Sequence, residues 1–193
     1  MTIRCPAGEL LPGVAGMTTE VPQRIPFPAG NEEARGVYGR LTNGQRLAGH
    51  LPRAIQEGSR ALSASLLRDG RLPPSLREMI IVRVGYHTNS VYEVEQHRSL
   101  AMKFNVEEKR LDALACKLPP DLSEAESAVI AFVDELITVN RPSDSVLDRV
   151  RSHFDDGELL EMIFVAGNWW TLARMLETAG IPLEERRIGD EAG

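Results

Sequence analysis

The chain has 193 residues and a formal net charge of −6, from 22 basic and 28 acidic residues. This length suits one domain with a sizeable core, and the acidic balance disfavours nucleic acid and anionic membrane surfaces as partners. No apolar run approaches the length of a transmembrane helix, and the N-terminus lacks a signal-peptide pattern. We therefore expect a soluble, cytoplasmic protein that does not bind membranes.

Residues 1–30 are rich in proline and glycine, a composition that prevents a long helix and favours an extended arm. Such an arm is either a partly ordered tail or a segment docked against its own or another subunit. The two cysteines, Cys5 and Cys116, lie in different regions without metal-ligand or C-x-x-C spacing. Their positions suggest neither a disulfide framework nor a zinc site, and they fit a reducing compartment.

Residues 31–183 read as a single all-α domain, followed by a polar tail at 184–193. Asn31 is a candidate cap for a helix that continues to Arg40 and is ended by residues 42–44. A further helical stretch begins at residue 47, is interrupted by Pro52, and ends at residues 69–70. Alternation of apolar and polar residues is nowhere long enough to indicate a strand.

Residues 72–84 predict a buried helix that contains a carboxylate. Pro73 and Pro74 suit the first positions of a helix, and the residues that follow are apolar almost all round. Glu78 lies inside this run, so it must be paired, protonated or lining a cavity. One alternative is a structural ion pair with Arg83 or with an arginine from another helix.

A second helix follows a break in the pattern at residues 85–89. Ser90 and Glu93 satisfy the S-x-x-E capping pattern, which makes Ser90 the candidate N-cap. Glu93 would then sit near the positive end of the helix dipole, so we expect its ionised form to be favoured. His97 follows one turn later, within reach of Glu93, and Asn105 is a candidate left-handed residue at the end.

The last long helix is predicted to begin at Asp155 and to stop at Gly180, after an amphipathic helix that starts at Ser123. It is apolar nearly throughout, so it should be sandwiched between other helices or between subunits. The adjacent indoles of Trp169 and Trp170 either pack in the core or an interface, or one of them walls a pocket near Glu78 and His97.

Residues 72–106 resemble the core motif of the carboxymuconolactone decarboxylase and alkylhydroperoxidase D-like superfamily. That motif has a Glu on one helix, a short turn, and a second helix with either C-x-x-C-x-x-x-H or Tyr-Glu-x-x-x-His. The residues at the matching offsets are Glu78, Tyr92, Glu93 and His97. In the peroxidase branch both Ser90 and Glu93 would be cysteines. The resemblance therefore implies the decarboxylase-like branch, its helical bundle and a homo-oligomer.

The resemblance also implies roles for these side chains. His97 is the expected proton donor or shuttle, Glu93 the group that tunes it, and Glu78 a buried relay carboxylate. Tyr92 would be a hydroxyl donor at the pocket rim. The remaining candidates, expected to bind substrate, are Ser90, Trp169 and Trp170. Without the resemblance, the same spacing also fits a capping residue and a helix ion pair.

The expected function is that of a cofactor-independent lyase or isomerase of the carboxymuconolactone decarboxylase type. It would act by proton transfer on a small carboxylated lactone or another enolisable organic acid. Such chemistry strictly requires neither a metal nor an organic cofactor, because a stabilised enolate and a placed acid suffice. Two rivals stand beside it: a thiol-independent or vestigial alkylhydroperoxidase-like protein, and a non-catalytic oligomer that binds small ligands.

Overall fold

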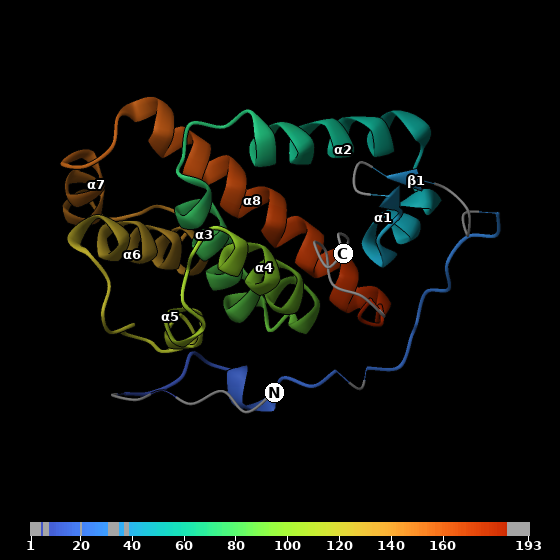
Figure 1. The fold of residues 1–193 in the computed structure, drawn as a ribbon, viewed down its shortest axis with the longest axis horizontal. Coiled ribbons are helices and arrows are strands. Elements are labelled where there is room, and N and C mark those ends of the chain that lie inside the picture. Colours follow the sequence, from blue (N-terminus) through green and yellow to red (C-terminus); the bar gives the residue numbers. More distant parts are fainter. Residues whose placement is uncertain (1–4, 6–7, 20, 31–34, 37–38, 185–193) are drawn as a thin grey trace.

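The computed structural model describes every residue except 1–4, 6–7, 20, 31–34, 37–38 and 185–193 (Figure 1). The described chain is helical apart from one pair of two-residue strands, so the expected all-α fold class is confirmed. Helix α3 (Pro74–Thr88) forms the centre and packs against α4 (Val91–Lys103), α6 (Glu124–Thr138) and α8 (Asp156–Ala179). Within the described residues, no helix is long and apolar enough to span a membrane.

Helices α3 and α8 occupy the interior because they are apolar around most of their surface. Ile80 and Ile81 of α3, which point in different directions, are both fully buried. Helix α8 begins at a reciprocal capping box between Asp155 and Glu158 and ends at Gly180, which has a left-handed backbone (φ 64°). The predicted limits of the last helix are therefore confirmed.

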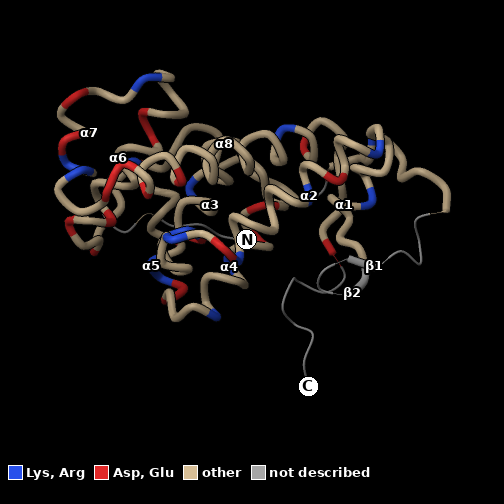
Figure 2. The backbone as a smooth tube through the Cα atoms, turned by 90° about the horizontal axis from the view of Figure 1, so that it is seen from above, with Lys and Arg blue, Asp and Glu red and all other residues tan. Residues whose placement is uncertain are grey.

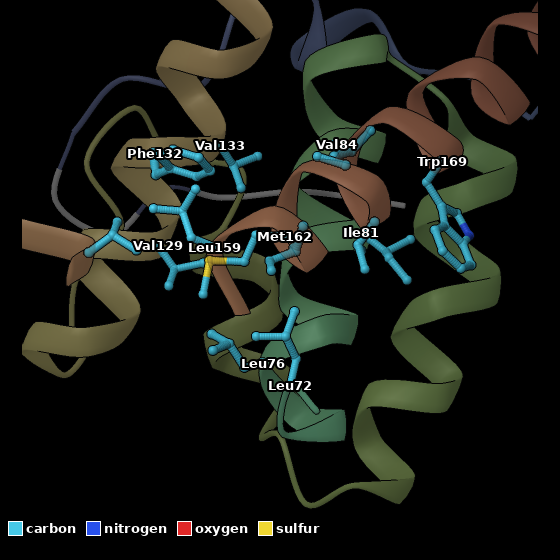
Figure 3. Close-up of a cluster of buried hydrophobic side chains, with 14 of the residues drawn as sticks. Leu72, Leu76, Ile81, Val84, Val129, Phe132, Val133, Leu159, Met162 and Trp169 are labelled. Atoms are coloured by element: carbon cyan, nitrogen blue, oxygen red, sulfur yellow. The ribbon is translucent and has the colours of Figure 1, made fainter. Parts of the chain in front are cut away.

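The larger hydrophobic cluster lies between α3, α6, α7 (Asp144–Arg151) and α8 (Figure 3). Trp169 lies at its edge in this view. A second cluster joins α3 and α4 to α5 (Glu108–Ala113) and to the N-terminal arm. Acidic and basic residues are interspersed over the peripheral helices α5 and α7, whereas most of α8 carries no charge (Figure 2).

A separate helical layer crosses α8 on the side that faces away from α6. It consists of α1 (Asn43–Leu47), the short 3₁₀ helix η2 (Ala48–His50) and α2 (Arg53–Arg68). Leu66 is the one residue of α2 that is buried. Polar contacts to α8 fix the layer and the segment that follows it: Asn168 donates to Ser63 of α2 at 3.1 Å, and the Glu161 carboxylate accepts from the amide of Arg71, just after α2, at 2.8 Å.

The helix predicted from Asn31 to Arg40 is wrong where the structure describes it. Residues Arg35–Gly36 (β1) and Gly39–Arg40 (β2) pair as antiparallel strands, with Gly36 opposite Gly39. Residues 31–34 and 37–38 lie outside the described part of the chain. The glycines explain the difference, because they weaken a helix and suit a tight reversal. Thr42 begins α1 with a capping box instead of ending a helix.

The described residues of the N-terminal arm dock on their own chain. Leu11 and Val14, the latter in the 3₁₀ helix η1 (Val14–Gly16), are buried in the second cluster. The Leu11 amide donates to the Ala115 carbonyl at 2.8 Å, which aligns the arm with the segment after α5.

Cys5 and Cys116 form a disulfide, so the expectation of unpaired cysteines is wrong. The two cysteines are 111 residues apart in the sequence. Their spacing therefore does not indicate that the N-terminal arm folds back beside Cys116.

Replacing Cys5 with alanine should lower the free energy of unfolding by about 2–4 kcal/mol, because the crosslink restricts a long loop in the unfolded chain. Urea unfolding with and without dithiothreitol measures this. The reductant should lower the wild type to the level of Cys5→Ala and leave the variant unchanged. Two free thiols in the unreduced protein would contradict the assignment.

Candidate active site

The turn between α3 and α4 brings the candidate residues together. Helix α3 continues through the predicted break to Thr88, and Asn89 then reverses the chain with a left-handed backbone (φ 54°). The Ser90 hydroxyl accepts from the Glu93 amide at 3.4 Å and caps α4 as predicted. At Gly85 an added Cβ would lie 2.8 Å from the Val94 side chain. This glycine therefore permits the close packing of α3 on α4.

A buried chain of polar contacts crosses from α3 through α4 to α8. Arg77 donates to one oxygen of the Glu78 carboxylate through Nε (3.0 Å) and Nη2 (2.8 Å). The other oxygen lies 2.6 Å from Nδ1 of His97. On the far side of that ring, the indole Nε1 of Trp169 donates to Nε2 at 2.7 Å. The partner of Glu78 is thus its own neighbour, whereas Arg83 binds Asp134.

These contacts fix the tautomer of His97. An indole N–H can only donate, so Nε2 of His97 must accept and carries no proton. The proton of the neutral ring is then on Nδ1, where the Glu78 carboxylate accepts it. Both ring nitrogens are therefore occupied within the protein. A substrate can reach Nε2 of His97 only if the Trp169 indole moves.

Glu93 is the ionisable group at this site without a strong internal partner. Its carboxylate lies 3.5 Å from Nε2 of His97, beyond good hydrogen-bond distance. Burial raises the pKa of Glu93 to about 7, and the neighbouring carboxyl groups of Glu177 and Glu78 reinforce this rise. The expectation that the helix dipole favours ionised Glu93 is wrong, because the loss of hydration outweighs the dipole. Glu93 can exchange a proton near neutral pH.

Glu93 and His97 line a cavity of about 350 Å³. Helix α4 provides one wall, and the rest comes from α1, η2, α2 and α8. Most of the lining is apolar, including Leu51, Leu100 and Leu172. The volume falls at the lower end of the range of about 300–1,000 Å³ that is usual for small-molecule sites. An acid or base in an apolar, enclosed space is suited to proton transfer on an organic substrate.

The remaining candidates differ in their relation to the cavity. Trp169 lines it, as does Tyr92. The Tyr92 hydroxyl donates to Glu184 at 2.5 Å and accepts from the Gly44 amide, and its pKa is raised by burial and by Glu184. This hydroxyl joins α4 to α1 and to the end of the described chain.

Ser90 and Trp170 do not belong to the residues that line the cavity. Ser90 is fully buried and caps α4. Trp170 is 40% exposed, and its ring lies 5.1 Å from the Arg174 guanidinium. The structure thus brings Glu78, Glu93, His97 and Trp169 together and leaves these two candidates apart.

Sequence reasoning missed Arg77 and the contribution of α2. Arg77 is only 4% exposed, and a signal was present because it precedes Glu78 inside an apolar run. Residues Ser59, Ser63 and Leu67 of α2 line the cavity at helical spacing. Nothing in the sequence of α2 indicates which helix that face meets.

The family model named carboxymuconolactone decarboxylase family matches residues 47–135, which include α2, α3 and α4. Among curated proteins, none matches the sequence of this chain at a significant level. The family match over residues 47–135 and the shared helical fold support the resemblance of this chain to the carboxymuconolactone decarboxylase and AhpD-like superfamily.

Solved structures share the fold at low sequence identity. An AhpD-core peroxidase-related protein from Ralstonia eutropha is 21% identical, with a TM-score of 0.67 over 75% of this chain and 78% of that one. A protein of unknown function from Agrobacterium tumefaciens is 18% identical, with a TM-score of 0.65 over 72% and 96% of the two chains. The debrominase Bmp8, in complex with 2,3,4-tribromopyrrole, is 17% identical, with a TM-score of 0.65 over 75% and 78%.

The raised pKa of Glu93 predicts a pH-dependent stability. Between pH 4.5 and about 7 the unfolded carboxyl is ionised while the folded one keeps its proton, so stability falls as pH rises through this window. Relative to Glu93→Gln, the wild type should lose about 3 kcal/mol there. Urea unfolding at a series of pH values measures the difference. Parallel curves for the two proteins would contradict the raised pKa.

The two tryptophans form a matched pair for testing the contact to His97. Trp169→Phe removes the indole donor and leaves Nε2 of a buried imidazole unpaired, so it should cost about 2 kcal/mol of unfolding free energy. Trp170→Phe changes an exposed ring and should cost less than about 0.5 kcal/mol. Equal losses in urea unfolding would argue against a specific bond between Trp169 and His97.

Proposed function

We propose that the protein is a cofactor-independent enzyme that moves a proton on a small enolisable organic acid, as a lyase or isomerase. The observation that carries this proposal is the position of Glu93. Its carboxyl group, with a pKa of about 7, lines an apolar cavity. A general acid or base is most effective when its pKa lies near the working pH.

The chemistry needs one group that both accepts and returns a proton. In isomerisation, ionised Glu93 takes a proton from the carbon next to a carbonyl, leaving an enolate, and then returns it to a different carbon. In decarboxylation, carbon dioxide leaves and its bonding electrons remain as the enolate. Protonated Glu93 then protonates the carbon. Each sequence balances without an oxidant, a reductant or another reactant.

His97 acts on Glu93 and not directly on the substrate in this proposal. The Glu78 carboxylate and the Trp169 indole hold its ring in place. Nε2 lies 3.5 Å from the Glu93 carboxylate, so the fixed ring shapes the surroundings of Glu93 without bonding it strongly. This assignment exchanges the roles that the resemblance implied for the two residues. Glu78 keeps the expected role of a buried carboxylate behind the histidine.

A thiol-based peroxidase mechanism would need a cysteine at the site, and its absence leaves the alkylhydroperoxidase-like rival only in its thiol-independent or vestigial form. Cys5 and Cys116 are joined to each other, and neither lines the cavity. Ser90 and Glu93 stand where the peroxidase motif would have its thiols. The debrominase structure, with its bound tribromopyrrole, supports a more limited point: this fold can accommodate a small cyclic organic molecule.

Deuterium incorporation measured by NMR tests the proposal. Butenolide acids with a single carboxylate, and the diacid carboxymuconolactone for comparison, are incubated in deuterated buffer with wild type, Glu93→Gln and His97→Ala. Glu93→Gln should slow exchange at least about 100-fold. Glu57→Gln is the control, because Glu57 lies on the exposed side of α2 and pairs with Arg53; it should exchange at the wild-type rate.

The pH profile supplies a second readout. Exchange begins with ionised Glu93, so its rate should rise about tenfold per pH unit below pH 7 and level off above it; decarboxylation, which uses protonated Glu93, should show the opposite trend. If exchange is retained in Glu93→Gln but lost in folded His97→Ala, the group that transfers the proton is His97 and not Glu93. Binding without any exchange in the wild type would favour the non-catalytic rival.

A further inference from the structure

Two arginines of α2 line the same cavity from a wall separate from Glu93. Arg60 and Arg68 are among its lining residues, and both are exposed, which places them at its opening to solvent. They lie eight residues apart on one helix, or about 12 Å along its axis. A ligand that enters the cavity therefore comes close to the positively charged guanidinium groups of Arg60 and Arg68.

The guanidinium groups of these arginines are largely unused. Among the described residues, Arg60 has no hydrogen-bond or ion-pair partner, and Arg68 uses only Nε, on the Ala64 carbonyl at 3.4 Å. Other arginines of the chain are engaged: Arg53 by Glu57, Arg77 by Glu78 and Arg83 by Asp134. The free donors of α2 thus belong to side chains that line this cavity.

The neutral polar groups of the cavity wall, in contrast, are mostly occupied. Gln56 donates to the Leu51 carbonyl at 2.7 Å, and Ser63 accepts from Asn168. Thr171 donates to the Gly167 carbonyl at 2.9 Å, and the Tyr92 hydroxyl bridges Gly44 and Glu184. A ligand with many hydroxyl or carboxyl groups would leave them unpaired here, which is costly.

We infer that the ligand of this cavity is a monocarboxylate with an apolar, ring-sized or alkyl body, held at its carboxylate by Arg60 or Arg68. This inference rests on the proposed function, which supplies the acid. Arginine matches the planar geometry of a carboxylate and can bind it through two parallel hydrogen bonds. The apolar body lies against the leucines of the wall, next to Glu93. The inference disfavours small, hydrophilic diacids.

Intrinsic fluorescence measures binding without requiring turnover. In a Trp170→Phe background Trp169 is the one remaining tryptophan, and it lines the cavity. The probes are phenylbutyrate, its neutral amide phenylbutyramide, and succinate as a small diacid. Phenylbutyrate should bind at least about tenfold more tightly than the amide, equivalent to about 1.4 kcal/mol. Succinate should bind most weakly.

Arginine variants locate the anchor. The double variant Arg60→Gln/Arg68→Gln should bind phenylbutyrate no better than phenylbutyramide, while its affinity for the amide stays at the wild-type level. The single variants assign the loss to one arginine. Arg53→Gln is the matched control, because Arg53 lies on α2 but does not line the cavity. It should bind all three probes like the parent protein.

Three results would overturn the inference: equal affinity for the acid and the amide in the parent, acid preference that survives in the double variant, or no binding of either phenyl compound. The proposed function fails separately. Arginine-dependent binding of the acid without deuterium exchange on any acid would leave this inference standing and remove the proton-transfer reaction. Deuterium exchange that does not depend on Arg60 or Arg68 would support the proton-transfer reaction and remove the proposed arginine anchor.

Discussion

The hydrogen bond between Glu78 and His97 is the constraint on which the site depends. A carboxylate with no exposed surface must be neutralised and hydrogen-bonded on both oxygens. Arg77 serves one oxygen and His97 the other. Because Glu78 accepts at Nδ1 of His97, Nε2 is left to accept from Trp169. Three helices are thereby joined through one imidazole ring.

Because both nitrogens of His97 are occupied, we assign the proton-transfer role to the neighbouring carboxyl group of Glu93. A histidine bound at both nitrogens is a good structural and electrostatic element but a poor direct partner for a substrate. Glu93, one turn earlier on α4, shares the same buried environment without a strong partner. Loss of hydration therefore raises the pKa of Glu93 to about 7, where proton exchange is useful.

The parts of this arrangement that the sequence predicted are local ones. The caps at Ser90, Ser123 and Asp155 and the left-handed Asn105 follow from short-range patterns and agree with the structure. The spacing of Glu93 and His97 on one helix is of the same kind. Features that depend on which helix meets which were not predictable, among them the indole of Trp169 at His97 and the cavity wall from α2.

Two errors have physical explanations of the same long-range kind. The ionised state expected for Glu93 was based on the dipole of its own helix. Burial by other helices instead determines the pKa of this side chain. The disulfide between Cys5 and Cys116 depends on an arm that returns along residues 115–117. In both cases the decisive neighbour is far away in the sequence, where periodicity and spacing carry no information.

Between Glu78 and Trp169, His97 is held as a neutral ring with its proton on Nδ1. Long-range nitrogen–proton NMR correlation of the His97 ring in labelled protein at neutral pH tests it most directly, with His97→Gln used to assign the signals. We expect a protonated Nδ1 and an unprotonated Nε2. A ring with its proton on Nε2 would contradict the bond from Trp169 and would return His97 to the role of proton donor.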